Sequence, residues 1–143
     1  MSGSTLQGSS LPPMYRNNPE IQQQVRQVQS TLACNQEMVS GVVDIFYNIN
    51  VRDERVNLFF SGVDMGRLRR MLVKYLMHVL GGEEYNGKSM RAAHRHLLDI
   101  TDAHYDAILE NLSRAFLLYG CSQSYTERVI AVAETLRDDV IGR

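Results

Sequence analysis

The residue in this sequence with the clearest capacity for chemistry is His94, which lies in the middle of the stretch from Tyr85 to Tyr105. It follows two alanines and a glycine-rich segment, a pattern that predicts a short helix after a loop. An imidazole held in this way is a suitable ligand for a metal or for the iron of a cofactor. A lone histidine after alanines is also common as a packed or hydrogen-bonded structural residue, so these residues alone leave both interpretations open.

Composition excludes several classes of protein. The chain has 143 residues, 22% of them charged, and a formal net charge of -1, which favours one globular domain and argues against a nucleic-acid partner. No run approaches the roughly 20 apolar residues that span a bilayer, and the first residues lack the apolar core of a secretory signal. Cys34 and Cys121 lie far apart without a CxxC spacing, which indicates neither a disulfide framework nor a zinc site. We therefore expect a cytoplasmic protein with no membrane partner.

The N-terminal segment differs from the rest of the chain. Residues 1–18 are rich in Ser, Gly and Pro and lack apolar periodicity, so we expect a disordered tail before a domain at 19–143. The tail has no acidic residue, which leaves an organelle transit peptide as an alternative, although Arg16 is its only basic residue. A first helix is predicted from Pro19 to about Leu32.

Two longer helices are predicted upstream of His94. Asn35 is placed to cap a helix that ends near the polar run from Asn48 to Glu54, and its apolar face carries Met38, Val42, Ile45 and Phe46. An apolar triplet, Leu58-Phe59-Phe60, and a break at Ser61-Gly62 precede Asp64, which should cap the helix Met65–Leu80. That helix has an apolar stripe at three-and-four spacing, consisting of Leu68, Met71, Leu72, Tyr75, Leu76, Val79 and Leu80. Its opposite side carries Arg67, Arg69, Arg70 and Lys74.

Glycines and caps divide the remainder of the chain. Gly81-Gly82 should end the preceding helix and start the loop to Ser89. Thr101 should cap a helix to about Tyr119, and a final helix is expected from Ser124 to Ile141. The sequence shows no alternation typical of strands, so the predicted fold class is all-α.

The motifs, in their order and spacing, resemble those of the truncated haemoglobins, most closely group I. The resemblance covers Gln36 to Leu136 and rests on Phe46-Tyr47, Phe59-Phe60 with Gly62, Asp64-Met65, Gly81-Gly82, Tyr85-x-Gly87, Met90 and His94. It implies a shortened globin fold, a two-over-two helical sandwich that encloses haem b. Cys34-Asn35 stands where the family has a Gly-Gly turn, so the first helix is the weakest part of the match.

The resemblance also assigns a site. It makes His94 the axial iron ligand and implies that the cofactor is bound by Phe46, Phe60, Met65, Leu68, Met71, Leu72, Tyr85, Met90, His94 and Tyr105. His96 should face solvent, since residues two apart on a helix point to nearly opposite sides. His104 is expected to pack or cap, and His78 to be structural.

Tyr47 is the expected catalytic residue, because it is the only hydrogen-bond donor among the residues that the resemblance places over the iron. Many relatives have a polar residue on the following helix, where this chain has Leu68, Met71 and Leu72. The pocket should therefore be unusually apolar, although these three residues are also at ordinary core spacing. Met71 as a second iron ligand is an alternative, and flexible core filling is the commoner role of methionine.

The resemblance implies a protein that binds O2, NO and CO at a five-coordinate haem iron. NO dioxygenation follows from group I: oxygen and NO combine to nitrate, and a partner reductase restores the iron. Two alternatives from other classes are a haem-based gas or redox sensor and a haem-free interaction module.

Overall fold

A computed structural model describes residues 19, 35–97 and 99–143 of the chain. Its elements are α3 (Gln36–Asn50), the short 3-10 helix η2 (Asn57–Phe60), α4 (Met65–Gly81), α5 (Met90–His94), α6 (Asp102–Tyr119), α7 (Gln123–Thr135) and α8 (Arg137–Ile141). This part of the chain is entirely helical, as the sequence predicts. The predicted tail at 1–18 lies outside the described residues, and so does the predicted first helix apart from Pro19.

The predicted capping residues account for where the longer helices begin. The side chain of Asn35 accepts a hydrogen bond from the Met38 amide at 2.8 Å, and Asp64 accepts one from the Arg67 amide at 3.1 Å. Thr101 and His104 form a reciprocal capping box at the start of α6, which confirms a capping role for this histidine. At the other end of α4, Gly82 adopts φ +75°, a left-handed conformation that ends the helix.

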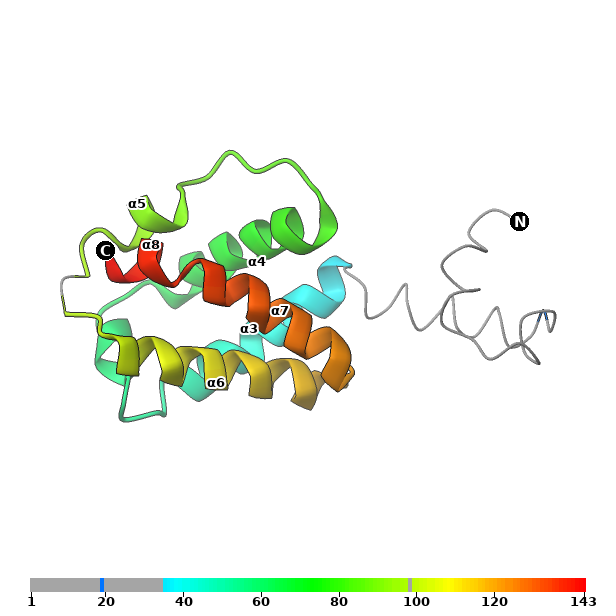
Figure 1. Cartoon of the computed structure of the whole chain (residues 1–143), viewed down its shortest axis with the longest axis horizontal. Helices are drawn as coiled ribbons and strands as arrows, with labels where there is room; N and C mark the ends of the chain where they lie inside the picture. The colour runs from blue at the N-terminus through cyan, green and yellow to red at the C-terminus, as the bar shows by residue number, and fades with distance from the viewer. Residues whose placement is uncertain (1–18, 20–34, 98) are drawn as a thin grey trace.

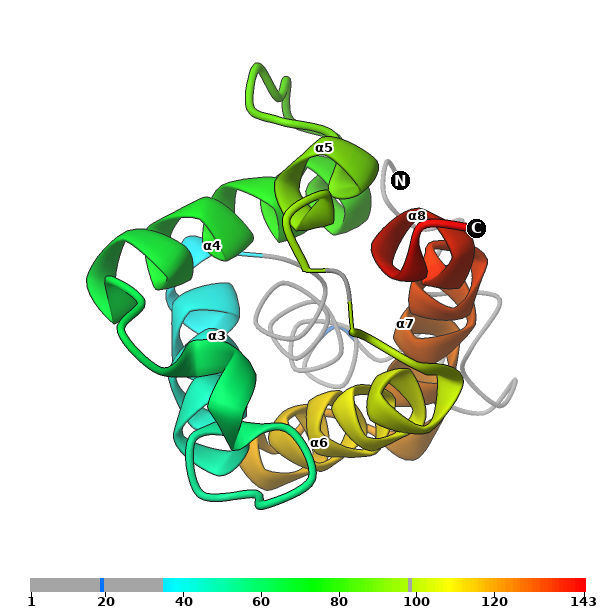
Figure 2. The same cartoon turned by 90° about the vertical axis from the view of Figure 1, so that its left-hand side faces the viewer.

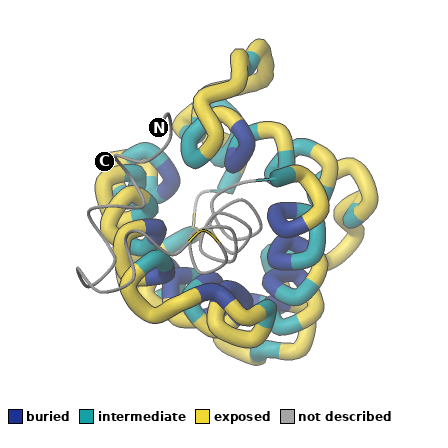
Figure 3. The backbone as a smooth tube through the Cα atoms, turned by 90° about the vertical axis from the view of Figure 1, so that its right-hand side faces the viewer, coloured by how far each residue is buried: buried dark blue, intermediate teal, exposed yellow. Residues whose placement is uncertain are grey.

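The helices surround a common interior. Figure 2 shows them arranged as a ring, and Figure 3 shows buried positions on the inner sides of the ribbons. α3 packs against both α4 and α6, while α6 also packs against α7 and α5 packs against α8. The main core is formed chiefly by α3, with Met38, Val39, Val42, Val43, Phe46 and Tyr47, together with Leu76, Met77, Leu112, Ala115, Phe116, Cys121 and Val129. A side chain at Gly41 would collide with the Tyr119 ring, so glycine permits the close approach of α3 to α6.

The end of the chain differs from its prediction. The expected continuous helix from Ser124 to Ile141 is two helices, α7 and α8, separated at Leu136. The amide of Leu136 bonds the carbonyl of Ala133 instead of the one four residues back, so the helical ladder tightens and the direction changes. No glycine or proline marks this break in the sequence. We attribute the break to the packing of α8 against α5 and α6.

Polar groups in the interior were not predicted. Asn50 and Asn111 are buried, and the Asn111 amide donates to Asn50 Oδ1 at 2.8 Å and to Asp53 Oδ2 at 2.9 Å. These bonds join the end of α3 to the middle of α6. Arg55 continues the network outward through ion pairs to Asp53 at 2.7 Å and Glu110 at 2.8 Å.

Two side chains lie elsewhere than the sequence pattern indicates. Leu58, expected in an apolar cluster, is 83% exposed, whereas its neighbours Phe59 and Phe60 point inward. Arg69, expected on the solvent side of α4, reaches across to α3, where it pairs with Asp44 at 3.4 Å and Asn48 at 3.3 Å. Among the described residues, no helix is both long enough and apolar enough to cross a membrane.

Candidate functional site

A cavity of about 570 Å³ is lined by side chains from η2 and from all six described α-helices. Its size is within the range of roughly 300 to 1,000 Å³ that is usual for ligand and cofactor pockets. Most of its walls are apolar, with Phe46, Phe60, Leu68, Leu72, Leu112 and Val132 among the contributing residues. The exposed residues Arg67 and Lys88 also line it, so the cavity reaches solvent at a basic edge.

His94 presents its imidazole to this cavity from the end of α5. Its Nδ1 lies 2.8 Å from the carbonyl oxygen of Met90. A carbonyl only accepts hydrogen bonds, so Nδ1 carries the proton and the lone pair is on Nε2. Burial lowers the pKa of His94, which further favours the neutral ring. These are the properties of an imidazole prepared to bind a metal through Nε2.

The surroundings of His94 restrict the kind of metal that it could bind. The described part of the chain contains no group of three or more His, Cys, Asp or Glu side chains that could enclose a bare ion. An iron held by a porphyrin needs only one or two protein ligands and an apolar cavity around the ring. The donor set and the lining therefore fit a haem better than a protein-only metal centre.

Tyr47 enters the cavity from α3 and is 6% exposed. Its ring contacts Phe46, with centroids 5.0 Å apart, and meets Phe60 edge-on at 5.8 Å. The Tyr47 hydroxyl makes no hydrogen bond with any residue that the structure describes. Burial raises the pKa of Tyr47 well above its usual value, and the positive charge of Arg69 opposes this rise only in part. The group is thus a neutral phenol with a free donor.

Three further tyrosines line the cavity, and the hydroxyls of two of them already donate hydrogen bonds. Tyr85 donates to the Lys88 carbonyl at 2.6 Å, and Tyr105 donates to the Ala133 carbonyl at 2.7 Å. Tyr75, on α4, packs edge-on against Tyr85 with centroids 5.3 Å apart. Its hydroxyl, like that of Tyr47, has no hydrogen-bond partner among the described residues. Sequence reasoning counted Tyr75 only as part of the apolar stripe, although its hydroxyl was a signal of polar capacity.

The other predicted cofactor-binding residues lie mostly at the cavity. Phe46, Phe60, Leu68, Met71, Leu72, Tyr85, Met90 and Tyr105 are part of its lining. Met65 is not; it packs, partly buried, against the main core instead. Sequence reasoning also missed several lining residues, namely Phe59, Ile100, Ile108 and Val132, because helix periodicity does not distinguish a cavity wall from a core.

The remaining histidines have separate positions. His96 is exposed and contributes to the edge of the cavity. His104 lines the cavity from the capping box, and its ring meets Phe59 edge-on at 4.9 Å. His78 is exposed, with Nδ1 2.7 Å from the Glu83 carbonyl oxygen and its ring stacked on Tyr85 at 5.7 Å. Neither His78 nor His104 has an imidazole as buried and as free at one nitrogen as that of His94.

Comparisons with known proteins identify the family of the chain. The profile of a family described as bacterial-like globin matches residues 33–141. The chain is 36% identical over 107 residues to a group 1 truncated haemoglobin of Chlamydomonas moewusii; the alignment covers 73% of this chain but only 63% of that relative. Among solved structures, the truncated haemoglobin of Tetrahymena pyriformis in its Fe(III) form is similar with a TM-score of 0.72 at 31% identity, covering 81% of this chain and 98% of that one.

A second solved structure extends the likeness to a bacterial protein. The 2/2 haemoglobin of Synechococcus sp. PCC 7002, in the cyanomet state with covalently attached haem, is similar with a TM-score of 0.70 at 35% identity. The match covers 73% of this chain and 90% of that one.

Proposed function

Since this chain belongs to the bacterial-like globin family, as a group 1 truncated haemoglobin, we propose that it binds oxygen and nitric oxide at a haem and converts them to nitrate. Haem-based binding of diatomic gases is the general property of the family. Because the family binds haem, the alternative of a haem-free interaction module is rejected. The oxidation of nitric oxide is our proposal for this chain.

His94 is the proposed iron ligand, because it combines a place in the cavity wall with an unprotonated Nε2. The apolar side chains that line the same cavity, such as Phe46, Leu72 and Val132, would contact the macrocycle. The basic residues Arg67 and Lys88, at the exposed edge of the cavity, would be able to pair with the carboxylates of a haem. A haem held by these residues would supply an iron that can bind a small gas.

The observation that carries the proposal is the free hydroxyl of Tyr47. Oxygen gains negative charge when it binds to ferrous iron, so a donor in a water-poor cavity stabilises it by about 1.5 to 3 kcal/mol. Nitric oxide and carbon monoxide gain much less charge and benefit less. An apolar wall of Leu68, Met71 and Leu72 admits uncharged gases without a desolvation cost.

Nitrate formation from one O2 and one NO requires one electron to return the iron to the ferrous state. That electron is expected to come from a partner reductase in the cytoplasm. Tyr47 would retain oxygen long enough for NO to enter, and the apolar lining would exclude water that competes for the hydroxyl. Met71 is expected to pack against the porphyrin without binding the iron.

The test is anaerobic addition of NO to the oxygenated ferrous protein, followed by stopped-flow absorbance and nitrate analysis. We expect one nitrate for each haem, with ferric protein as the other product. A Tyr47→Phe variant should give the same yield of nitrate when NO is mixed immediately after oxygen. When NO is added after a delay without free oxygen, the variant should give less nitrate, because it has already released its oxygen. If NO only displaces oxygen and no nitrate appears, the protein is not an NO dioxygenase, and a sensor becomes the better interpretation.

A further inference from the structure

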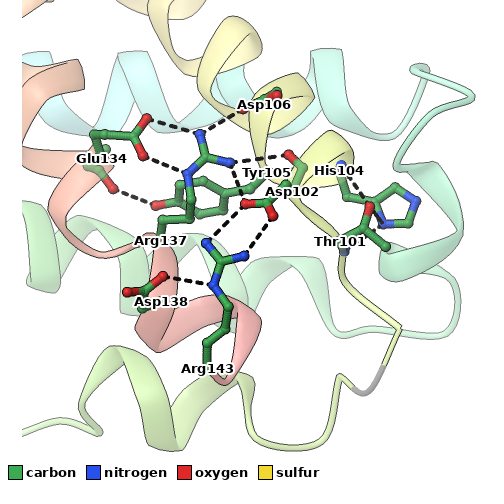
Figure 4. Close-up of polar contacts among 10 residues, drawn as sticks. Thr101, Asp102, His104, Tyr105, Asp106, Glu134, Arg137, Asp138 and Arg143 are labelled. Carbon is green, nitrogen blue, oxygen red and sulfur yellow. Dashed lines mark hydrogen bonds and ion pairs between the residues drawn. The ribbon is translucent and has the colours of Figure 1, made fainter.

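A cluster of arginines and carboxylates joins α8 to the start of α6, on the outer side of the cavity. Arg137 pairs with Asp102 at 3.0 Å, Asp106 at 2.6 Å and Glu134 one turn earlier (Figure 4). Its side chain is only 16% exposed although all three partners are exposed by half or more. A guanidinium enclosed by three carboxylates is held in one orientation, unlike an isolated surface pair.

Arg143 extends this cluster. It pairs with Asp102 at 2.7 Å and with Asp138 at 3.1 Å, so Asp102 is shared between two arginines (Figure 4). Hydrogen bonds from Arg143 and then Arg137 lower the pKa of Asp102, which keeps this carboxylate charged at any physiological pH. The cluster thus fixes both ends of α8 to the first turn of α6.

The cluster has a direct contact with the cavity wall. The guanidinium carbon of Arg137 lies 5.0 Å from the centroid of the Tyr105 ring, a cation–π arrangement. Tyr105 lines the cavity and is buried with Leu109 and Val140 in a second, smaller core. Met90, the first residue of α5, packs against the same small core. Arg137 therefore covers the outer side of the group of residues on which α5 rests.

A third arginine links α8 to α5 itself. Arg91 pairs with Asp139 at 3.0 Å and donates to the main-chain oxygen of Arg143 at 3.0 Å. α5 has only five residues, and a helix of that length does not persist without tertiary contacts. Its place is consequently set by Met90 on one side and Arg91 on the other. His94 lies one turn beyond Arg91, on the same short helix.

We infer that α8 acts as a positioning element for α5. In this arrangement Arg91, held by Asp139 of α8 and by the main-chain oxygen of Arg143 just after α8, sets how firmly His94 is presented to the cavity. The inference rests on the proposal that His94 binds the haem iron. It assigns Arg91, Arg137 and Arg143 to haem retention, although none of them lines the cavity.

The experiment uses the ferric haem-bound protein and measures haem transfer to excess apomyoglobin. Arg91→Met keeps an unbranched apolar stem but removes the charge and the hydrogen-bond donors of the guanidinium. We expect haem loss to accelerate by about threefold to tenfold, as befits one ion pair and one hydrogen bond. Arg91→Lys, which can still pair with Asp139, should lose haem at a rate close to that of wild type. In 1 M NaCl the difference in rate between Arg91→Met and wild type should become smaller.

Arg55→Met is the matched control, because Arg55 also makes two ion pairs but joins the turn that follows α3 to Glu110 of α6, away from α5. It should leave haem loss unchanged even if it lowers the resistance of the protein to urea. Hydrogen exchange supplies a second readout: amides of α5 should exchange faster in the haem-bound Arg91→Met variant and not in Arg55→Met.

Two results would overturn the inference. One is a rate of haem loss in Arg91→Met within about twofold of wild type. Such a small change would mean that the Arg91 contacts are an ordinary surface ion pair with no role in haem retention. The other is equal acceleration in Arg55→Met, which would mean general destabilisation. The iron ligand is tested separately by His94→Ala: loss of haem in that variant, combined with an unchanged Arg91→Met, refutes the positioning role and leaves the proposed haem site intact.

Discussion

The two sides of the cavity hold their polar groups in different ways. On the side built by α5, α6 and α8, His94 Nδ1 and the Tyr105 hydroxyl are both bonded to main-chain carbonyls, and ion pairs surround α8. On the side built by α3 and α4, the Tyr47 hydroxyl has no hydrogen bond within the described residues and is set among apolar side chains. On the first side these polar groups already have hydrogen-bond partners, whereas on the second side the Tyr47 hydroxyl keeps a free donor.

This difference corresponds to two distinct chemical requirements. A metal ligand must present one lone pair in one direction, which a second hydrogen bond to the opposite ring nitrogen ensures. A group that stabilises a transient ligand must have its donor unoccupied until the ligand arrives, since an existing bond would have to be broken first. Under the proposed function, His94 would hold the iron permanently, whereas Tyr47 would bond a gas ligand only while that ligand is present.

His94→Ala should have the largest effect on this comparison. Removing the imidazole that is proposed to bind the iron should weaken haem binding by at least about a hundredfold, more than the loss of an outer-shell partner. The helical circular dichroism should largely persist, because the apolar faces form the fold. His96→Ala, which removes an exposed imidazole two residues away, serves as the control for the haem titration and should bind normally. Tight haem binding with an unaltered spectrum in His94→Ala would show that another ligand holds the iron.

Tyr47→Phe tests the other side. Loss of the free donor should accelerate oxygen dissociation by about one to two powers of ten, which corresponds to 1.5 to 3 kcal/mol. Carbon monoxide dissociation should change much less, because carbon monoxide carries little charge. Stopped flow on the ferrous protein provides both rates.

Tyr75→Phe is the matched control for that experiment, because Tyr75 also lines the cavity with an unbonded hydroxyl. Tyr75 packs against Tyr85, whereas Tyr47 packs against Phe46 and Phe60. We expect its removal to leave the oxygen rate close to that of wild type. A larger effect for Tyr75→Phe than for Tyr47→Phe would reverse the assignment of the donor.

Arg69→Met should have a smaller effect on the same rate. The Arg69 charge favours the phenolate form of Tyr47, and a phenol polarised in this direction is a stronger donor. Without it, oxygen should leave about twofold to fivefold faster, the effect of one partly exposed charge at a distance. Arg69→Lys retains the charge and should be nearly neutral. Identical oxygen rates in all three proteins would remove Arg69 from the pocket.

The smallest expected effect is that of pH. Since the pKa of Tyr47 is raised by burial, the phenol stays protonated as pH rises and loses its proton only well above the usual value near 10. Oxygen dissociation should thus be constant from about pH 6 to pH 9. An acceleration with a midpoint inside that range would indicate an ionised or solvent-exposed Tyr47.

The sequence predicts those parts of the molecule that depend on neighbouring residues. Asn35, Asp64 and Thr101 each bond an amide within the first turn of their own helix, so these starts are visible in a short window of sequence. The placement of His94 at the cavity followed from the family resemblance, since a lone histidine after two alanines has no unique meaning.

What the sequence does not predict depends on partners that are distant along the chain. Arg137 finds Asp102 thirty-five residues away, and Arg69 finds Asn48 twenty-one residues away. Neither pairing has a local signature, and the break at Leu136 follows from the same kind of contact. Met65 shows the converse limit: its motif matched the family, yet its side chain turned to the core.

The buried amides of Asn50 and Asn111 have a consequence for how the chain avoids incorrect packing. They lie sixty-one residues apart, and their bond forms only when α3 and α6 meet in one relative position. A slip of either helix by one turn would leave carboxamide groups buried without partners, at a cost of about 1 to 3 kcal/mol for each lost bond. The apolar side chains along the same two helices could tolerate such a slip more easily. The Asn50–Asn111 pair therefore favours one alignment of α3 and α6, which apolar contacts alone would not fix.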